Sequence, residues 1–340
     1  MERILVTGGA GFMGSNFVRW LLKNTKYKVI VIDKLTYAGN MDNFPKEVKR
    51  SPRFEFIRED VANRRKVREA YKRVDKIVHF AAETHIDRSI MDLTPFVKTD
   101  FVGTSVLLEE LLHSPKERFI HISTSEVYGT AQRIPMDENH PIIPQSPYAA
   151  TKAGADRLVQ SFYITYNLPL IILRPFNNYG PNQYPEKLIP LFITNALENK
   201  PLPIYGTGEN TRDWLYVEDF CEALGKVLEM PIEKIKGRII NIGTGEEHSV
   251  NEIATKILEI LHKPKSLMKR IGDRPGHLKR LCCDTRTAKE ILGWEASTDF
   301  EKGLELTVKW YLDNELWWRR IKRQKNYQKF YKSWYRRLMR

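Results

Sequence analysis

The stretch RILVTGGAGFMG, residues 3–14, decides the fold of this chain. It begins with a mostly apolar run typical of a buried strand, and glycines follow at positions 8, 11 and 14. We expect a tight turn at Gly8, close approach of the backbone to a ligand at Gly11, and close packing of a helix at Gly14. The free amides at the start of such a helix suit phosphate groups. The stretch therefore predicts a phosphate-binding strand–turn–helix unit.

A second strand, expected over residues 28–32, ends at Asp33. An acidic residue about 20 positions beyond such glycines can accept hydrogen bonds from an adenosine ribose, and it repels a 2′-phosphate. The sequence therefore predicts a dinucleotide site that prefers NAD to NADP, a preference that the neighbouring Lys34 weakens. The small pair Ala81-Ala82 would let the backbone approach the cofactor, and Asp60 is expected either near the adenine or as a helix cap.

The alternation of strands and helices continues along the chain. Further strands are expected at residues 54–57, 76–80, 118–122 and 169–173, with helices near 63–73, 94–113 and 147–167. This order predicts an α/β fold with a doubly wound parallel sheet, a Rossmann domain, over residues 1–176. A helix over 218–229 and a strand over 238–243 are expected to rejoin it, within residues 213–245.

A smaller C-terminal domain is expected from residues 177–212 and 246–315. It would start with a polar loop over 177–185, followed by helices over 187–199 and 250–261, the second capped by Ser249. Residues 316–340 would form a tail.

The bulk composition fits a globular enzyme, with 42% hydrophobic and 29% charged residues among 340. No apolar run approaches the roughly 20 residues that span a bilayer, and the early strand leaves no room for a signal peptide. Three cysteines without a CxxC pair predict neither a disulfide framework nor a zinc site, and no other metal site is expected. We therefore expect a cytoplasmic protein. His79, His121 and Cys221 are expected in the core.

The tail carries most of the net charge of +13, because residues 316–340 contain ten basic residues and no acidic residue. Its aromatic and apolar residues recur at helical spacing: Tyr327, Phe330, Tyr331, Trp334, Tyr335 and Leu338. This pattern predicts a basic amphipathic helix. We favour docking of its aromatic stripe on the body of the chain or a partner copy, with adsorption to an anionic membrane as the rival. No nucleic-acid partner is expected, since no recognition module accompanies the charge.

Two stretches carry the expected chemistry, Ser123–Gly129 (STSEVYG) and the later YAATK at 148–152. The first follows a buried strand, so its polar groups would lie at the carboxyl edge of the sheet, where ligands bind. Tyr148 and Lys152 are four residues apart and share a helix face. A lysine beside a phenol would lower the phenol's pKa from about 10 and produce a base for a sugar hydroxyl.

With these residues in view, residues 3–316 resemble the extended short-chain dehydrogenases/reductases that act on nucleotide sugars, and most closely the dTDP-glucose 4,6-dehydratases. The ordered markers are TGGAGFMG (7–14), DKLTYAGN (33–40), AAETHIDRS (81–89), NNYGP (177–181), EKLIP (186–190), RDWLYV (212–217) and RPGH (274–277). We further expect cofactor contacts from Phe12, Met13, Thr36, Val61 and Thr99, besides Tyr148 and Lys152. The resemblance also implies a homodimer that pairs the helices 94–113 and 147–167.

The resemblance implies a mechanism with NAD as a regenerated cofactor. Tyr148, steadied by Lys152 and Thr124, would take the proton of the C4 hydroxyl while hydride leaves C4. Glu126 would remove the C5 proton, water would leave from C6, and hydride would return to C6. General acid–base steps of this kind contribute about 10²–10⁴-fold each.

One residue departs from the family pattern. The dTDP-glucose enzymes typically carry Thr-Asp-Glu where this chain has Thr124-Ser125-Glu126, as in GDP-mannose 4,6-dehydratases, so Glu126 would handle both proton transfers. UDP-glucuronate decarboxylases share the STSEVYG stretch and also oxidise C4. A decarboxylase, a 4-epimerase and a non-catalytic NAD-binding adaptor with a membrane-binding tail therefore stay open as alternatives.

The resemblance places the nucleotide-sugar contacts in later segments. The expected residues are His85, Asn178, Lys187, Leu188, Tyr205, Arg212, Asn241, Arg274 and His277. An arginine fork can donate two hydrogen bonds to a phosphate, although Arg212 and Arg274 could instead pair with Asp213 and Asp273. Residues 278–281 (LKRL) differ from the family's usual continuation, which leaves the identity of the nucleotide base open.

Overall fold

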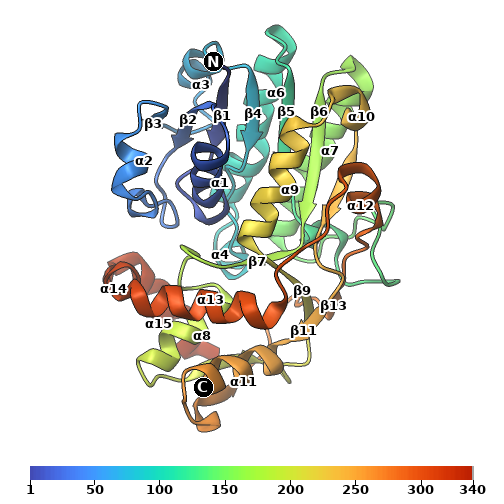
Figure 1. The fold of residues 1–340 in the computed structure, drawn as a ribbon. Coiled ribbons are helices and arrows are strands. Elements are labelled where there is room, and N and C mark those ends of the chain that lie inside the picture. The colour runs from blue at the N-terminus through green and yellow to red at the C-terminus, as the bar shows by residue number, and fades with distance from the viewer. Residues whose placement is uncertain (339–340) are drawn as a thin grey trace.

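The structure is a computed structural model that describes residues 1–338, with side chains through residue 335. Seven strands form the central sheet: β1 (Arg3–Thr7), β2 (Lys28–Asp33), β3 (Phe54–Arg58), β4 (Lys76–His79), β5 (Arg118–Ile122), β6 (Leu170–Pro175) and β10 (Ile239–Ile242). All are parallel, in the order β10-β6-β5-β4-β1-β2-β3 (Figure 1). The predicted doubly wound sheet is confirmed, and its order reverses between β1 and β4.

Alternating apolar residues cover both faces of this sheet, as in other buried parallel sheets. Ile4 and Val6 pack in one core with residues of α1 (Phe12–Asn24) and α9 (Val217–Glu229). Leu5 points to the other core, which α3 (Arg64–Tyr71), α6 (Gly103–His113) and α7 (Pro147–Tyr166) complete. The sheet is therefore held rigidly between two helical layers, and its carboxyl edge can position a site.

The helical segment expected over residues 94–113 is confirmed, although it is not a regular α-helix throughout. The chain forms a short α5 (Thr94–Phe96) and then a π-helical turn, η2 (Val97–Val102), before α6. The turn buries Asp100, whose carboxylate accepts hydrogen bonds from the Glu83 amide (2.8 Å) and the Thr151 hydroxyl (2.9 Å). π turns re-aim side chains and are frequent at functional sites. The π-helical turn therefore indicates a functional site at the carboxyl edge of the sheet.

A second lobe follows β6, with its own core and smaller sheets. Its strands are β7 (Asn177–Tyr179), β8 (Leu202–Tyr205), β9 (Thr211–Tyr216), β11 (Glu247–Ser249), β12 (Met268–Ile271) and β13 (Arg280–Leu281). Its main helices are α8 (Leu188–Leu197), α11 (Val250–Ile260) and α13 (Phe300–Asp313). The loop predicted over 177–185 is wrong at its start, because β7 pairs with β9 and Tyr179 is fully buried in the core of this lobe. Ser249 caps α11, as predicted.

Short elements complete the chain: η1 (Met41–Asn43), α2 (Lys46–Arg50), α4 (Ile86–Met91), η3 (Ser125–Tyr128), α10 (Ile232–Ile235), η4 (Lys265–Leu267) and α12 (Arg286–Leu292). His79, His121 and Cys221 are buried, as predicted. Among residues 1–338, no helix combines the length and the apolar character needed to cross a membrane.

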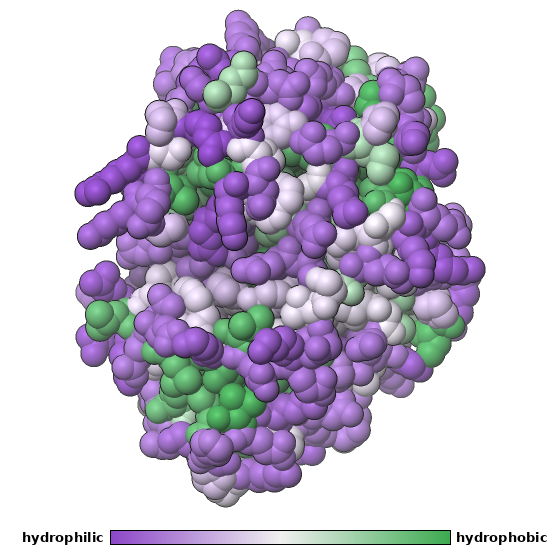
Figure 2. All heavy atoms as spheres, viewed as in Figure 1, coloured by the Kyte–Doolittle hydropathy of each residue, from purple (hydrophilic) through white to green (hydrophobic). Residues whose placement is uncertain are grey.

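The tail forms two helices, α14 (Glu315–Arg323) and α15 (Lys325–Leu338), which fold back onto the second lobe (Figure 1). Its buried aromatic residues are Trp318, Tyr327, Phe330, Trp334 and Tyr335. The Lys322 ammonium donates to the Glu198 carboxylate (2.6 Å) beside α8. The aromatic stripe is thus docked on the body of the chain; Leu338 lies outside the residues whose side chains are described. Figure 2 shows a largely hydrophilic face with a hydrophobic patch on this lobe.

Candidate active site

A cavity of about 360 Å³ runs from the glycine turn after β1 into the second lobe. It opens at the carboxyl edge of the sheet where the strand order reverses, the usual ligand position in such folds. All the residues predicted for catalysis line it, as do all those predicted for the cofactor except Asp60 and all those predicted for the substrate except Asn241.

The cofactor half of the cavity begins at the glycine turn. Gly8 has a positive φ of 68°, and a Cβ there would lie 2.6 Å from the Ala81 nitrogen. A Cβ on Gly11 would have only the Gly8 carbonyl within 4 Å, so this glycine borders open space at the start of α1. Asp33 lines the cavity, with one oxygen on the Ala10 amide (3.0 Å) and the other on the Leu35 amide (2.8 Å). A glycine-walled cradle with an oriented carboxylate fits a dinucleotide.

Asp60, predicted near the adenine, does not line the cavity. One of its oxygens accepts a hydrogen bond from the Ala62 amide (2.9 Å), which closes a local turn before the Asn63 cap of α3. The other oxygen lies near the ammonium groups of Lys98 (3.3 Å) and Lys34 (3.9 Å). Glu59 and Val61 on either side of it do line the cavity, so the contact of Asp60 with the adenine stays a prediction.

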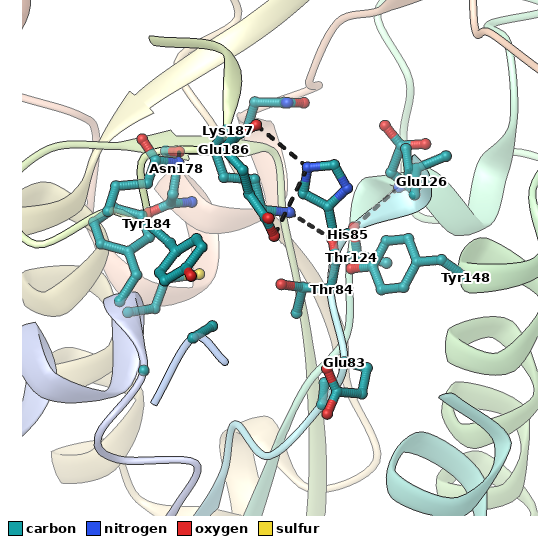
Figure 3. Close-up of a pocket in the computed structure, with 18 of the residues that line it drawn as sticks. Glu83, Thr84, His85, Thr124, Glu126, Tyr148, Asn178, Tyr184, Glu186 and Lys187 are labelled. Atoms are coloured by element: carbon teal, nitrogen blue, oxygen red, sulfur yellow. Dashed lines mark hydrogen bonds and ion pairs between the residues drawn. The ribbon is translucent and has the colours of Figure 1, made fainter. Parts of the chain in front are cut away.

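The catalytic candidates meet at the carboxyl end of β5 (Figure 3). Thr124 caps η3, where its hydroxyl accepts a hydrogen bond from the Glu126 amide (3.2 Å). Tyr148 comes from the first turn of α7, which Ser146 caps, and its ring meets Phe96 edge-on at 6.2 Å. Ser125 is fully buried in the wall of the cavity. A hydroxyl, a carboxylate and a phenol thus face one space beside the cofactor half.

The expected lowering of the Tyr148 pKa by Lys152 is not what the structure shows. Burial raises the pKa of Tyr148 above its usual value, and the negative charges of Asp100 and Glu126 raise it further, while hydrogen bonding to Thr124 opposes them. The Lys152 ammonium donates instead to the Ile122 carbonyl at 2.7 Å. Sequence spacing placed the two residues on one face correctly, but it could not include the desolvation of the phenolate.

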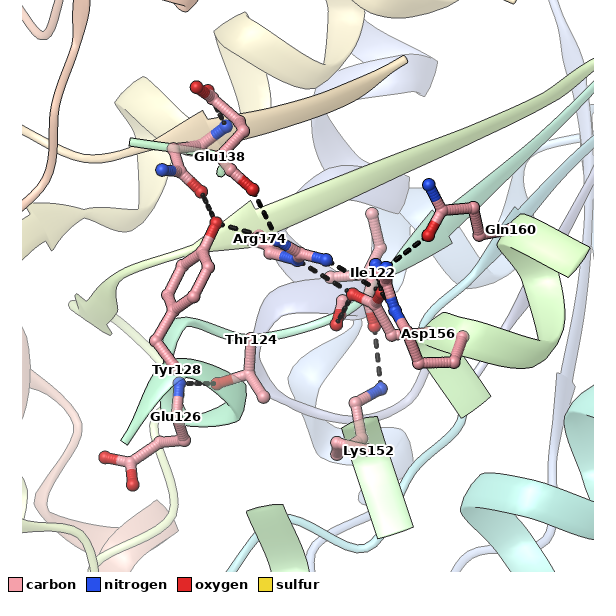
Figure 4. Close-up of polar contacts among 12 residues, drawn as sticks. Ile122, Thr124, Glu126, Tyr128, Glu138, Lys152, Asp156, Gln160 and Arg174 are labelled. Atoms are coloured by element: carbon pink, nitrogen blue, oxygen red, sulfur yellow. Dashed lines mark hydrogen bonds and ion pairs between the residues drawn. The ribbon is translucent and has the colours of Figure 1, made fainter. Parts of the chain in front are cut away.

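A buried ion pair lies beside this edge of the sheet (Figure 4). Two nitrogens of Arg174 donate to the two oxygens of Asp156, each at 2.9 Å, and a third bond runs from Arg174 to the Tyr128 hydroxyl (2.8 Å). The Tyr128 hydroxyl donates to Asn241 (2.7 Å). Asn241 is therefore a buried structural residue, and the prediction that it contacts substrate is wrong. It lies on β10, the strand beside β6, and its side chain faces Tyr128 and not the cavity.

The second lobe contributes cationic and polar groups to the far half of the cavity. Arg212, on β9, has its Nε 3.9 Å from a Glu126 oxygen, and burial lowers its pKa to about 10. Arg274 lies with one terminal nitrogen 3.3 Å from Asp87, not paired through its side chain with Asp273, and its Nε has no partner among the side chains that the structure describes. The Lys187 ammonium donates to the Thr84 carbonyl, and burial lowers its pKa to about 8.

Three further residues complete the far half. The Asn178 amide oxygen is buried and has no hydrogen-bond partner within the described part of the chain, although its nitrogen donates to the Phe176 carbonyl (3.0 Å). His85 is buried, its Nδ1 contacts no hydrogen-bonding group of the residues described, and desolvation lowers its pKa. His277 contacts Asp273 (2.7 Å), yet burial lowers its pKa to about 4. Such buried, unsatisfied donors and acceptors facing a cavity suit a polar, anionic ligand.

Comparisons with known proteins agree with this geometry. A family model described as GDP-mannose 4,6 dehydratase matches residues 5–307. The chain belongs to this family. It is 46% identical to the low-salt glycan biosynthesis protein Agl12 of Haloferax volcanii, with 92% of the chain and 99% of that protein covered. It is 43% identical to a dTDP-glucose 4,6-dehydratase of Streptomyces niveus, with 94% and 96% covered.

A solved structure of dTDP-glucose 4,6-dehydratase from Bacillus anthracis, in complex with NAD, superimposes with a TM-score of 0.88. The two chains are 42% identical, and the match covers 95% of this chain and 100% of the Bacillus anthracis chain. These matches confirm the predicted family, and with it an NAD-dependent lyase that dehydrates a nucleotide sugar.

In this member of the dehydratase family, sequence reasoning missed several acidic groups at the site. Glu83, Asp87 and Glu186 all line the cavity, and Asp100 lies behind Tyr148. Glu83 and Asp87 stand in the AAETHIDRS stretch just after β4, so their place beyond a buried strand was the available signal. Among the described residues, no group of three metal-binding side chains gathers.

The buried ion pair gives a prediction about stability. Arg174→Met would leave the Asp156 carboxylate buried with the exposed Arg157 as its remaining cationic partner, so we expect the free energy of unfolding to fall by about 3–5 kcal/mol. Arg157→Met, which removes that more exposed partner, should cost less than about 1 kcal/mol. Urea unfolding of both variants measures the difference. Equal losses would show that the buried pair is not the support inferred here.

Glu83 gives a prediction about pH. Burial raises its pKa to about 7, against the opposing effect of Lys34. Between about 4.5 and 7 the folded chain keeps a proton that the unfolded chain releases, so this group lowers stability as pH rises through that window. Glu83→Gln should gain up to about 3 kcal/mol on wild type between pH of about 5 and about 8, measured by urea unfolding. Glu69→Gln, at an exposed carboxylate, serves as the control and should show no such gain. If Glu83→Gln gains no more stability than Glu69→Gln, the assignment is contradicted.

Proposed function

We propose that this enzyme converts dTDP-glucose to its 4-keto-6-deoxy form, with the residues that the sequence predicted. The observation that carries the proposal is the meeting of Thr124, Glu126 and Tyr148 in one cavity, between the glycine cradle and the buried arginines of the second lobe. NAD, when bound in the cradle, supplies the hydride acceptor and donor. Arg212 and Arg274 would hold the diphosphate through charge-assisted hydrogen bonds.

The chain's own residues divide the proton transfers. Tyr148 takes the proton of the C4 hydroxyl as its phenolate and becomes the neutral phenol, and the hydrogen bond to Thr124 favours the phenolate form beforehand. Glu126 removes the C5 proton, which the C4 ketone makes acidic, and returns a proton to the departing C6 hydroxyl. Ser125 cannot supply that proton as a carboxylic acid would, so Glu126 acts in both directions. The Arg212 guanidinium, with its Nε 3.9 Å from a Glu126 oxygen, helps to keep this carboxylate in place.

The substrate assignment is tested by product mass. The protein is incubated separately with dTDP-glucose, UDP-glucose, GDP-mannose and UDP-glucuronate, and the products are identified by mass spectrometry. We expect the loss of one water, fastest with dTDP-glucose. Loss of carbon dioxide from UDP-glucuronate would identify a decarboxylase, and conversion at unchanged mass would identify an epimerase; either result without dehydration overturns the proposal. The cytoplasmic location stays a prediction.

We further propose a homodimer that pairs the α5–η2–α6 segment with α7. Large apolar side chains are exposed along this face: Met91, Leu93, Val97, Phe101, Val102, Ile164 and Tyr166. Exposed apolar patches of this kind mark protein interfaces. Phe101 lies against α7, since a Cβ on Gly154 would be 3.2 Å from its ring.

The dimer is tested by light scattering. The double variant Val97→Asp/Phe101→Asp places two charges in the proposed interface, so it should be a monomer at concentrations where wild type is a dimer. Leu312→Asp, on the exposed side of α13, should remain dimeric. A wild-type monomer, or a double variant that stays dimeric, would contradict the pairing.

A further inference from the structure

Asp100 is a buried carboxylate behind the first turn of α7, and the proposed reaction does not use it. It lies in the π-helical turn η2, where the Thr104 hydroxyl donates to its backbone carbonyl at 2.5 Å. The residue is 1% exposed and does not line the cavity. Any part that its carboxylate has in the reaction must therefore act through other residues.

The two oxygens of this carboxylate connect two walls of the site. One accepts a hydrogen bond from the Glu83 amide (2.8 Å), in the loop after β4, and the other from the Thr151 hydroxyl (2.9 Å) on α7. Thr151 directly precedes Lys152, and its hydroxyl also lies 2.8 Å from the Tyr148 carbonyl. Asp100 thus holds the turn of α7 that carries Tyr148 and Lys152 against a loop that lines the cavity.

The Thr151 hydroxyl has one proton for two acceptors. When Asp100 is ionised, that proton goes to the charged carboxylate and not to the Tyr148 carbonyl. When Asp100 carries a proton, it can donate to Thr151, which then donates to the carbonyl, so that both contacts are hydrogen bonds. Burial raises the pKa of Asp100 to about 6, although Lys152, the two hydrogen bonds and Lys34 oppose the rise. The residue therefore changes its charge close to neutral pH.

The charge of Asp100 acts on the Tyr148 phenol through an interior that screens it little. A like charge nearby disfavours a phenolate, and the carboxylate raises the pKa of Tyr148 in addition to the effect of burial. The other titratable groups that face this carboxylate or the phenol come from four further parts of the chain: Lys152 on α7, Glu83 after β4, Lys34 after β2 and Glu126 on η3.

We propose that Asp100 is a positioning residue for the catalytic base: it holds the Tyr148 turn of α7 in place, and its negative charge disfavours ionisation of the phenol. The inference rests on the proposed function, because it takes Tyr148 as the base. Ionisation of Asp100 above pH of about 6 then offsets part of the activity that the phenol gains as pH rises. A neutral side chain at this position should remove that restraint.

The test is the pH profile of kcat for Asp100→Asn, with dTDP-glucose and the full-length, NAD-loaded protein. Asparagine can accept from the Glu83 amide and donate to the Thr151 hydroxyl, so it keeps both contacts and removes the charge. Loss of a like charge should move the profile by about one pH unit towards acid, so that kcat is about tenfold above wild type between pH of about 7 and about 8. Below pH of about 5, where Asp100 is neutral in wild type as well, the two rates should agree. KM and bound NAD should stay unchanged.

The matched control is Asp313→Asn, which makes the same change of charge at an exposed aspartate of α13 and should keep the wild-type profile. In a Tyr148→Phe background, Asp100→Asn should give no gain, because the phenol on which the charge acts is absent. If Asp100→Asn does not retain NAD, Asp100→Ser takes its place. Serine is neutral and smaller and can accept from the Glu83 amide, so the same shift is expected.

A neutral variant whose profile coincides with that of wild type would overturn the inference, and so would a gain that persists without the Tyr148 hydroxyl. An equal loss of kcat at every pH would show that Asp100 has a structural role alone, which also contradicts the inference. A Tyr148→Phe variant that keeps the wild-type rate would instead overturn the proposed base, and this inference with it.

Discussion

Replacing Tyr148 with phenylalanine is expected to lower kcat by about 10²–10⁴-fold, the contribution of a positioned general base. The substitution removes only the hydroxyl, so the ring keeps its edge-on contact with Phe96 at 6.2 Å and the helix keeps its Ser146 cap. Affinity for dTDP and the content of NAD should therefore be unchanged. Turnover of dTDP-glucose, followed by mass spectrometry, measures the loss.

The matched control is Tyr166→Phe, at the exposed end of the same helix α7. It should retain wild-type kcat. The pH profile adds a second check: because burial raises the pKa of Tyr148, we expect activity to rise with pH until the phenol ionises. A Tyr148→Phe variant with the wild-type rate would remove the phenol from the reaction.

Glu126→Gln is expected to stop the reaction after the oxidation of C4. The amide is close to the carboxylate in size but cannot accept a proton from C5, so release of the dehydrated sugar should fall by about 10²–10⁴-fold. The sugar recovered after quenching should have lost two hydrogens and kept its C6 oxygen, because Tyr148 is intact. Mass spectrometry of a single turnover distinguishes this species from substrate and product.

The experiment must also check that Arg212 keeps its position, since its Nε lies 3.9 Å from the carboxylate that the substitution neutralises. The Kd for dTDP should stay at the wild-type value if Arg212 keeps its place. Glu109→Gln, an exposed carboxylate on α6, serves as the neutral comparison and should retain full activity. Full turnover by Glu126→Gln would remove Glu126 from the mechanism.

Local patterns predicted much of this fold and of the cofactor half of the site. Gly8 and Gly11 follow β1, and Asp33 ends the adjacent strand β2, so their spacing alone places them around one crevice. Tyr148 and Thr124 were found for the same reason, because a strand end and a helix face are properties of short stretches. The aromatic stripe of α15 likewise indicated a docked helix.

What the sequence could not show depends on contacts between distant segments. Asn241 has the residue type of a ligand contact, but its side-chain oxygen accepts a hydrogen bond from Tyr128, which is 113 positions away in the sequence. The raised pKa of Tyr148 depends on its burial and on Asp100, which a π turn brings close. A path of hydrogen bonds from Trp334 through Tyr205 to Asp87 joins three separate parts of the chain. No local periodicity carries such information.

The most direct test follows one hydrogen of the substrate. Wild-type enzyme is given dTDP-glucose that carries deuterium at C4, and the product is examined by mass spectrometry and nuclear magnetic resonance. Our account predicts a sugar that has lost one water and bears the deuterium at C6. A product of unchanged mass, or a dehydrated product whose deuterium has gone to the solvent, would contradict it.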